Sequence, residues 1–175
     1  MCLSRALAAA IFAGCGAEPP VESTTPDTIP ERATGLLAAG GLVPFDAPVD
    51  RLGELPRDPY ADSIHPDPRM AERIRRGYDL FRRTPELAPE FSGNDLSCAS
   101  CHVNGGQRER ALPLVGVSGT FPQYRTRDDR LVTLEDRIGG CFKRSMNGTA
   151  PPQNHPVSLA LAAYIAWLSE GQPTG

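Results

Sequence analysis

The 175-residue sequence predicts an all-α domain over residues 67–175, preceded by an irregular, proline-rich N-terminal segment. Two observations predict this class. Three stretches after residue 67 carry apolar residues at helical spacing. The first third of the chain is instead rich in Pro, Asp, Glu, Thr and Gly, without a sustained apolar period. No stretch shows a persuasive strand pattern. The net charge of -3 gives no broad basic surface, so the composition excludes a nucleic-acid-binding class.

Residues 1–15 have the order of a bacterial export signal, with a charged start, the apolar run Ala6–Ala13 and small residues at the end. The run is too short to span a bilayer. Ile11–Cys15 resembles a lipobox, with Phe12 where a smaller aliphatic residue is more usual, and this predicts lipid attachment at Cys15. An ordinary cleaved signal is the alternative. Both interpretations export the protein to the periplasm. Only the lipidated form would contact the membrane, and only through its lipid anchor.

Residues 16–66 are predicted to form a tether and then an arm that wraps the folded domain. The tether extends to about Ala33. Between Gly35 and Leu55 several apolar residues are expected to pack on the domain as irregular coil, namely Leu36, Leu37, Leu42, Val43, Phe45 and Leu52.

The first predicted helix begins near Asp67, because Pro68 suits the first helical turn. The second begins at Thr133, where Thr133–Asp136 resembles a capping box, and is expected to end near Gly148. The third is expected from Pro156 to Gly171. Their apolar faces are Met70, Ile74, Tyr78 and Phe81 in the first, Leu134, Ile138 and Phe142 in the second, and Leu161, Tyr164, Ile165 and Leu168 in the third.

The string Cys98-Ala99-Ser100-Cys101-His102 has the C-x-x-C-H spacing. Two thiols at this spacing reach the two vinyl groups of a porphyrin, and the adjacent histidine binds the iron. A chance match has a probability of about 0.002 at this composition. A redox C-x-x-C motif would need a βαβ pattern, and a zinc site a second Cys/His pair, and the sequence shows neither. The motif therefore predicts a c-type cytochrome with one covalent haem c.

Pro113 lies eleven residues after His102, where many cytochromes c use a proline carbonyl to accept a hydrogen bond from the proximal imidazole. An ordinary turn proline is an equal alternative. In class I cytochromes c the first and last helices also cross with a glycine at their close approach. Gly77, with Phe81 against Tyr164 or Trp167, resembles that contact.

The opposite face of the iron has Cys141, Met146 and His155 as candidate ligands. Cys141 is the one cysteine that neither the signal nor the haem motif uses. Arg137, Cys141 and Ser145 follow one another at four-residue spacing, hence on one helical face, and a cation near a thiol favours the thiolate that iron binds. From spacing alone, a structural cysteine beside a solvated arginine remains an alternative, as does Met146.

From Gly77 to Gly175 the sequence resembles the haem domain of tetrathionate-forming thiosulfate dehydrogenases, which are related to the cysteine-ligated cytochrome subunit of the sulfur-oxidising complex. The resemblance is carried by Gly77–Phe81, Gly93–Ser97, Phe121–Arg125, Thr133–Arg137, Cys141–Gly148 and Ala163–Leu168.

This resemblance implies that Cys141 is the distal haem ligand and takes part in the chemistry, and that Arg127, Arg137 and Ser145 line an anion pocket. It predicts electron transfer linked to oxidation of thiosulfate to tetrathionate. The related enzymes carry a second haem domain, so a partner cytochrome or another periplasmic acceptor is expected here. A low-potential electron relay, and a carrier or sensor of a sulfur species, are the alternatives.

Overall fold

The computed structural model describes residues 42–46 and 55–173. The predicted signal, Cys15 and the tether lie outside the described residues. Over the described ranges, no helix combines the length and the apolar character needed to cross a membrane.

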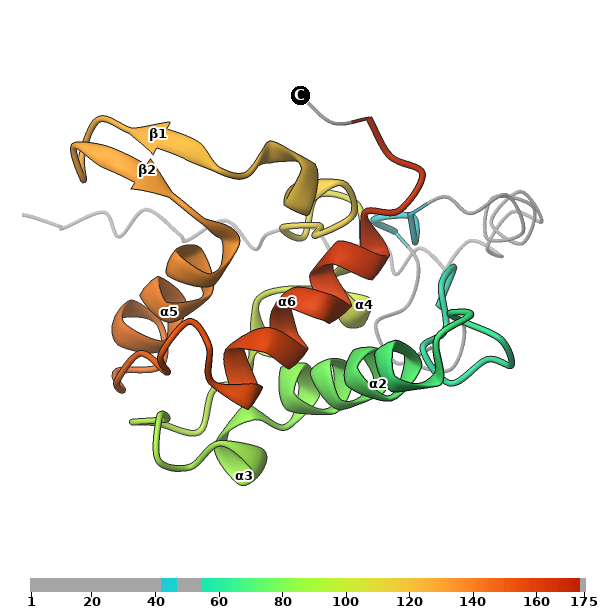
Figure 1. Cartoon of the computed structure of the whole chain (residues 1–175), viewed down its shortest axis with the longest axis horizontal. Helices are drawn as coiled ribbons and strands as arrows, with labels where there is room; N and C mark the ends of the chain where they lie inside the picture. Colours follow the sequence, from blue (N-terminus) through green and yellow to red (C-terminus); the bar gives the residue numbers. More distant parts are fainter. Residues whose placement is uncertain (1–41, 47–54, 174–175) are drawn as a thin grey trace, which may run out of the picture.

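Two long helices cross to form the centre of the domain (Figure 1). Helix α2 (Pro68–Arg82) begins where the sequence predicted, because the Asp67 side chain accepts a hydrogen bond from the Arg69 amide at 2.9 Å. Helix α6 (Pro156–Leu168) begins as predicted but ends before Gly171. The early end follows from the C-cap, where the Ser169 amide bonds the Ala166 carbonyl.

The crossing depends on Gly77. A Cβ atom at this position would overlap the carbonyl oxygen of Ala160 and lie 2.8 Å from Cβ of Tyr164. Next to the crossing, the rings of Phe81 and Tyr164 pack at a tilt with centroids 5.5 Å apart. The predicted glycine contact between the first and last helices is therefore confirmed, with Ala160 and Tyr164 as the neighbours.

Helix α5 (Leu134–Arg144) packs against α6. Thr133 and Asp136 form the predicted capping box, in which each side chain accepts a hydrogen bond from the other residue's amide at 3.2 Å. The expected end near Gly148 was wrong by one turn, because Ser145 forms the C-cap and Asn147 has a positive φ of 49°.

Short elements connect these helices. They are α3 (Thr84–Leu87), the 3₁₀ turn η1 (Cys98–Ser100), α4 (Val103–Gly106) and the 3₁₀ turn η2 (Val117–Thr120). An antiparallel hairpin, β1 (Gln123–Arg125) and β2 (Arg130–Val132), precedes α5. The domain is mostly helical, as the predicted all-α class requires, but this short hairpin was not predicted. Tyr124 and Leu131 face each other across the hairpin and are both exposed, so the strands lack the apolar alternation by which a strand is detected.

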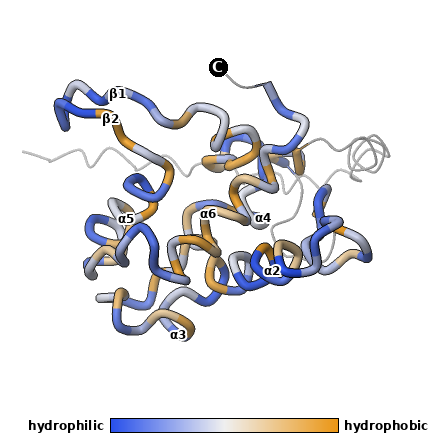
Figure 2. The backbone as a smooth tube through the Cα atoms, viewed as in Figure 1, coloured by the Kyte–Doolittle hydropathy of each residue, from blue (hydrophilic) through white to orange (hydrophobic). Residues whose placement is uncertain are grey.

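The core lies between α2, α5 and α6, and α6 contributes the largest share of it (Figure 2). The side chains with least exposure are Ile74, Leu80 and Phe81 from α2, Phe142 from α5, and Leu161, Tyr164 and Leu168 from α6. Met70 and Leu134, predicted to be buried, are only half-buried and lie at the edge of this core.

Two described parts of the N-terminal arm contact the domain. Val43 is buried and pairs with the chain around Arg108, its amide donating to the Gln107 carbonyl at 2.7 Å. The Gln107 side chain in turn holds Arg57, accepting from its amide at 2.8 Å and donating to its carbonyl at 2.9 Å. The packing predicted for Val43 agrees with the structure, whereas the Phe45 side chain is 53% exposed.

Candidate functional site

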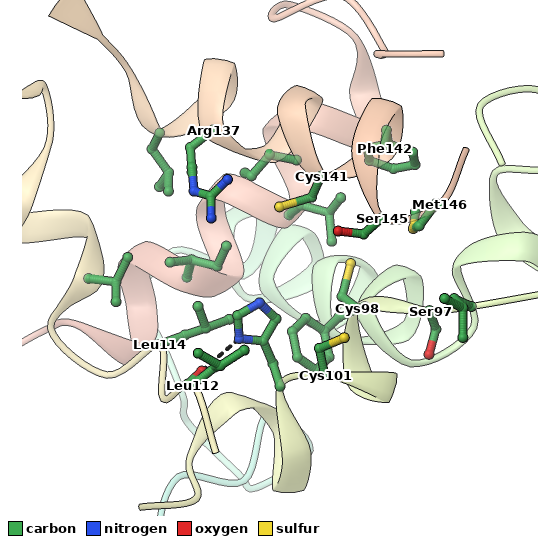
Figure 3. A pocket seen from close by; sticks show the side chains of 18 of the residues that line it. Ser97, Cys98, Cys101, Leu112, Leu114, Arg137, Cys141, Phe142, Ser145 and Met146 are labelled. Atoms are coloured by element: carbon green, nitrogen blue, oxygen red, sulfur yellow. Dashed lines mark hydrogen bonds between the residues drawn. The ribbon is translucent and has the colours of Figure 1, made fainter. Parts of the chain in front are cut away.

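A largely apolar cavity opens between α5, α6 and the loops around η1 and η2 (Figure 3). All three residues of the C-x-x-C-H motif that carry chemistry lie in its wall, namely Cys98, Cys101 and His102. The apolar part of the wall includes Phe81, Leu114, Phe121, Phe142, Leu161 and Ile165. A flat hydrophobic group would find its hydrophobic contacts here.

The short turn η1 begins at Cys98 and has Cys101 as its C-cap, and neither of these cysteines forms a disulfide with another described cysteine. Ser97 and Ser100 cap this turn through each other's side chain and backbone. The buried Thr84 hydroxyl accepts from the Cys98 amide at 3.3 Å. Burial raises the pKa of the Cys98 thiol to about 11, so this thiol is neutral at neutral pH.

The His102 ring is oriented by one backbone hydrogen bond. Its Nδ1 lies 2.6 Å from the carbonyl oxygen of Leu112. Because a carbonyl can only accept, Nδ1 carries the proton and Nε2 keeps its lone pair for a metal. Of the two alternatives for Pro113, the carbonyl acceptor is not the one found, because the carbonyl one residue earlier takes that place; Pro113 does line the cavity.

These residues fit a covalently attached haem c. Two free thiols at the required spacing, an imidazole with Nε2 as the unprotonated nitrogen and an apolar wall are the groups that such a haem needs. Cys98 and Cys101 would hold the porphyrin and His102 would be the proximal ligand.

Helix α5 supplies the cavity wall opposite the motif. Figure 3 shows Arg137, Cys141 and Ser145 on one side of the cavity and Cys101 and Leu112 on the other. The sequence predicted that the three α5 residues share a face, and the structure brings them together as predicted. The cavity therefore combines a thiol, a guanidinium and a hydroxyl opposite the haem motif.

The two alternative distal ligands lie differently. Met146 lines the cavity but is only 3% exposed and belongs to the core cluster. His155 is the N-cap of α6, where its Nδ1 accepts from the Val157 amide at 3.3 Å, and it does not line the cavity. Met146 thus stays the one alternative to Cys141 among the candidates from the sequence.

The structure does not bring Arg127 to this cavity. Arg127 is exposed in the turn between β1 and β2, and neither the haem cavity nor the adjoining polar pocket contains it. The expectation that it lines the anion pocket is therefore not met here. The hairpin gives the physical reason, because its turn extends into solvent beyond the paired residues Arg125 and Arg130.

Sequence reasoning missed three contributors to the site. The Leu112 carbonyl orients the proximal histidine, Thr84 supports Cys98, and Asn94 donates to the Ser145 carbonyl at 3.1 Å. A backbone acceptor leaves no signal in the side-chain pattern. Asn94 belongs to the stretch Gly93–Ser97, whose resemblance to related proteins was its one visible signal.

Asp136 links the start of α5 to the hairpin and gives a pH-dependent prediction. A hydrogen bond from Arg130 at 2.8 Å lowers the pKa of Asp136 to about 2 from its ordinary 3.8, and the Thr133 amide and Gln153 side chain act in the same direction. A lowered pKa means that the ionised form stabilises the fold above 3.8 and that this contribution disappears as the pH falls through about 2.

We expect Asp136→Asn to lower the melting temperature at neutral pH, and the difference from the wild type to shrink below pH 3.8 and vanish near pH 2. Thermal unfolding of both proteins across this range measures it. Glu135→Gln, one residue earlier in the same helical turn, is the matched control. A difference that stays constant with pH would contradict the assignment.

Comparisons with known proteins give consistent findings. Residues 88–174 match the family described as SoxA/TsdA, cytochrome c domain. The thiosulfate dehydrogenase of Allochromatium vinosum is 41% identical over 150 residues, which cover 83% of this chain and 54% of that protein. The SoxA subunit of L-cysteine S-thiosulfotransferase from Hydrogenobacter thermophilus is 41% identical over 111 residues, covering 59% of this chain and 40% of that protein.

A solved structure is also similar. The thiosulfate dehydrogenase (TsdBA) of Marichromatium purpuratum, in its as-isolated form, superposes with a TM-score of 0.60 at 38% identity, covering 68% of this chain and 27% of that chain. The present chain thus spans only about half or less of the length of these relatives.

Proposed function

Because residues 88–174 belong to the SoxA/TsdA family of cytochrome c domains, we propose that the chain is an exported monohaem cytochrome that transfers electrons during thiosulfate oxidation to tetrathionate. One observation carries the proposal. The cavity that contains the haem motif also contains Arg137, Cys141 and Ser145 on one face of α5. A thiol, a guanidinium and a hydroxyl beside the haem motif supply one candidate iron ligand and two groups that can donate hydrogen bonds to an oxyanion.

His102 and Cys141 are the two residues that would bind the haem iron. The haem, when bound, supplies a one-electron acceptor whose ferric state an anionic thiolate stabilises. His102 would present Nε2 to the iron, because the Leu112 carbonyl accepts a hydrogen bond from Nδ1. Cys141 supplies the thiolate from the opposite wall.

Arg137 and Ser145 are the proposed anion-binding groups. A guanidinium donates two parallel hydrogen bonds to an oxyanion, and a hydroxyl adds a third. In the overall reaction, the sulfane sulfurs of two thiosulfate dianions form one S–S bond, giving one tetrathionate dianion and two electrons. No proton is taken up or released, so the site needs cations and an electron acceptor and no general base.

A partner accepts these electrons. One haem takes one electron at a time, so a periplasmic cytochrome or another one-electron acceptor must remove both in succession. The similar solved structure is a thiosulfate dehydrogenase called TsdBA, and the present chain covers 27% of that chain. The proposal therefore places the present domain in contact with a redox partner, with export by the predicted signal and a lipid anchor at Cys15.

Turnover is tested with the purified, haem-loaded protein, thiosulfate and an artificial one-electron acceptor such as ferricyanide. The proposal predicts one tetrathionate formed for every two acceptor molecules reduced. Reduction by a chemical donor without tetrathionate formation would identify the alternative, a low-potential relay. A mass adduct on Cys141 in the isolated protein, without turnover, would identify a sulfur carrier or sensor.

Arg137→Ala should raise the KM for thiosulfate by about 10- to 100-fold, since a charge-assisted hydrogen bond contributes about 1.5–3 kcal/mol. Arg137→Lys keeps the charge but loses the fork of donors, so its KM should fall between wild type and alanine. Steady-state kinetics measure both.

Arg144→Ala is the matched control for Arg137, because Arg144 is exposed on the same helix and does not line the haem cavity. A KM that rises equally in Arg144→Ala and Arg137→Ala would mean that general positive charge, and no specific contact, attracts the anion.

A further inference from the structure

Asn94 joins the two walls of the haem cavity. It lies in the loop between α3 and η1, four residues before Cys98. Its Oδ1 accepts from the Leu96 amide at 3.0 Å, which shapes the chain leading into the haem motif. Its Nδ2 donates to the Ser145 carbonyl at 3.1 Å, at the end of α5. One side chain therefore connects the segment that would carry the haem to the helix that faces it.

The backbones of the same two segments are in direct contact around Asn94. The Gly93 amide donates to the Met146 carbonyl at 2.9 Å, and the Thr149 amide donates to the Phe91 carbonyl at 3.1 Å. A Cβ atom on Gly148 would overlap the Phe91 carbonyl. Because these backbones are so close, residues 91–94 and 146–149 can shift little relative to each other. A change at Asn94 therefore acts on a tightly packed contact.

The hydrogen bond from Asn94 completes the C-terminus of α5. The last carbonyls of a helix have no partner within the helix, and Asn94 satisfies that of Ser145. The Cys141 carbonyl accepts from the amides of Ser145 at 2.9 Å and Met146 at 3.2 Å. The helical turn that carries Cys141 thus ends at Ser145 and Met146, and the loop holds both residues in place. Asn94 binds the Ser145 carbonyl, and Gly93 binds the Met146 carbonyl.

We propose that Asn94 is a positioning residue, which fixes the Cys141 thiol and the Ser145 hydroxyl relative to the haem bound at Cys98. This inference rests on the proposed function, because it assumes that Cys141 ligates the iron. Asn94 itself does not line the cavity, so its effect passes through the two α5 residues. Loss of the Asn94 Nδ2 donor would loosen the last turn of α5. The Cys141 thiolate would then lie farther from the haem iron.

The test uses the full, haem-loaded chain and two variants. Asn94→Asp is close to isosteric and keeps the acceptor for the Leu96 amide, but it replaces the donor to Ser145 with a carboxylate oxygen. Asn94→Ala removes both hydrogen bonds. Thr149→Val is the matched control, because it removes the 3.4 Å bond from the Thr149 hydroxyl to the Glu90 carbonyl between the same two segments. The Thr149 amide bond to Phe91 is left in place.

EPR of the ferric proteins should show the low-spin thiolate signal in the wild type and in Thr149→Val. In both Asn94 variants the ratio of thiolate-ligated to unligated haem should fall about tenfold, the effect of losing one hydrogen bond of about 1.4 kcal/mol. The dissociation constant for thiosulfate, from an optical titration without turnover, should rise by about the same factor.

The outcomes separate the two proposals. A wild type without a thiolate signal would overturn the distal ligation on which the proposed function rests. A wild type with that signal, together with Asn94 variants that keep both the signal and the dissociation constant, would overturn the role of Asn94 alone. An equal loss of the thiolate signal in Thr149→Val would also overturn the role of Asn94. In that case the whole contact between residues 90–94 and 145–149 would position α5, and the Asn94 donor would have no specific effect.

Discussion

Gly77→Val should abolish the folded state or destabilise it by about 3 kcal/mol or more, the upper range for forcing atoms into a packed core. The new side chain would have to occupy the space of the Ala160 carbonyl and of Cβ of Tyr164. Because α2 and α6 are rigid over this stretch, their crossing can only open. Urea unfolding followed by circular dichroism measures the change.

Arg76→Ala serves as the control for Gly77, because Arg76 precedes it on α2 and is exposed. The free energy of unfolding of Arg76→Ala should stay within about 0.5 kcal/mol of that of the wild type. A Gly77→Val protein that unfolds at the wild-type midpoint would show that the close approach of α2 and α6 is not required for the fold.

Cys141→Ser should lower kcat for tetrathionate formation by at least about a thousandfold, the scale on which loss of an essential reacting group acts. Serine preserves the size of the side chain but supplies neither a thiolate ligand nor a sulfur nucleophile at neutral pH. The substitution should leave the covalent haem in place, since Cys98 and Cys101 hold it. Intact mass and stopped-flow kinetics with ferricyanide measure both properties.

Met146→Leu distinguishes the alternative ligand. Met146 lines the same cavity and is buried in the core, and leucine has a similar volume. If Met146→Leu changed the ligand signature of the iron while Cys141→Ser did not, Met146 would be the distal ligand and the proposed role of Cys141 would be wrong.

The helical frame was accessible from sequence because local chemistry determines it. Asp67 before Pro68, and Thr133 with Asp136, are capping signals that act within a few residues, and both helices begin where these signals predict. The end of α5 was predicted too late because the loop around Gly93 and Asn94 meets the chain beyond this helix. The end of α6 was predicted too late because the Ser169 amide bonds the Ala166 carbonyl and closes the helix before Gly171. The resemblance to the SoxA/TsdA cytochrome c domain is confirmed.

The site was predictable where residues share one element. Arg137, Cys141 and Ser145 lie on one helical face by spacing alone, and the structure brings this face to the haem motif. Arg127 could not be placed in this way, because its position depends on a hairpin whose exposed Tyr124 and Leu131 hide the strand pattern. The acceptor for His102 depends on the path of a loop, which residue types do not determine, so the sequence offered Pro113 and no signal for Leu112.

The central claim is a haem attached at Cys98 and Cys101 with His102 and Cys141 as its axial ligands. EPR of the ferric, haem-loaded protein, compared with Cys141→Met, tests it most directly. The account predicts a low-spin thiolate signal in the wild type that Cys141→Met lacks. An identical spectrum in both proteins, or a colourless protein from cells that contain haem-attachment machinery, would contradict it.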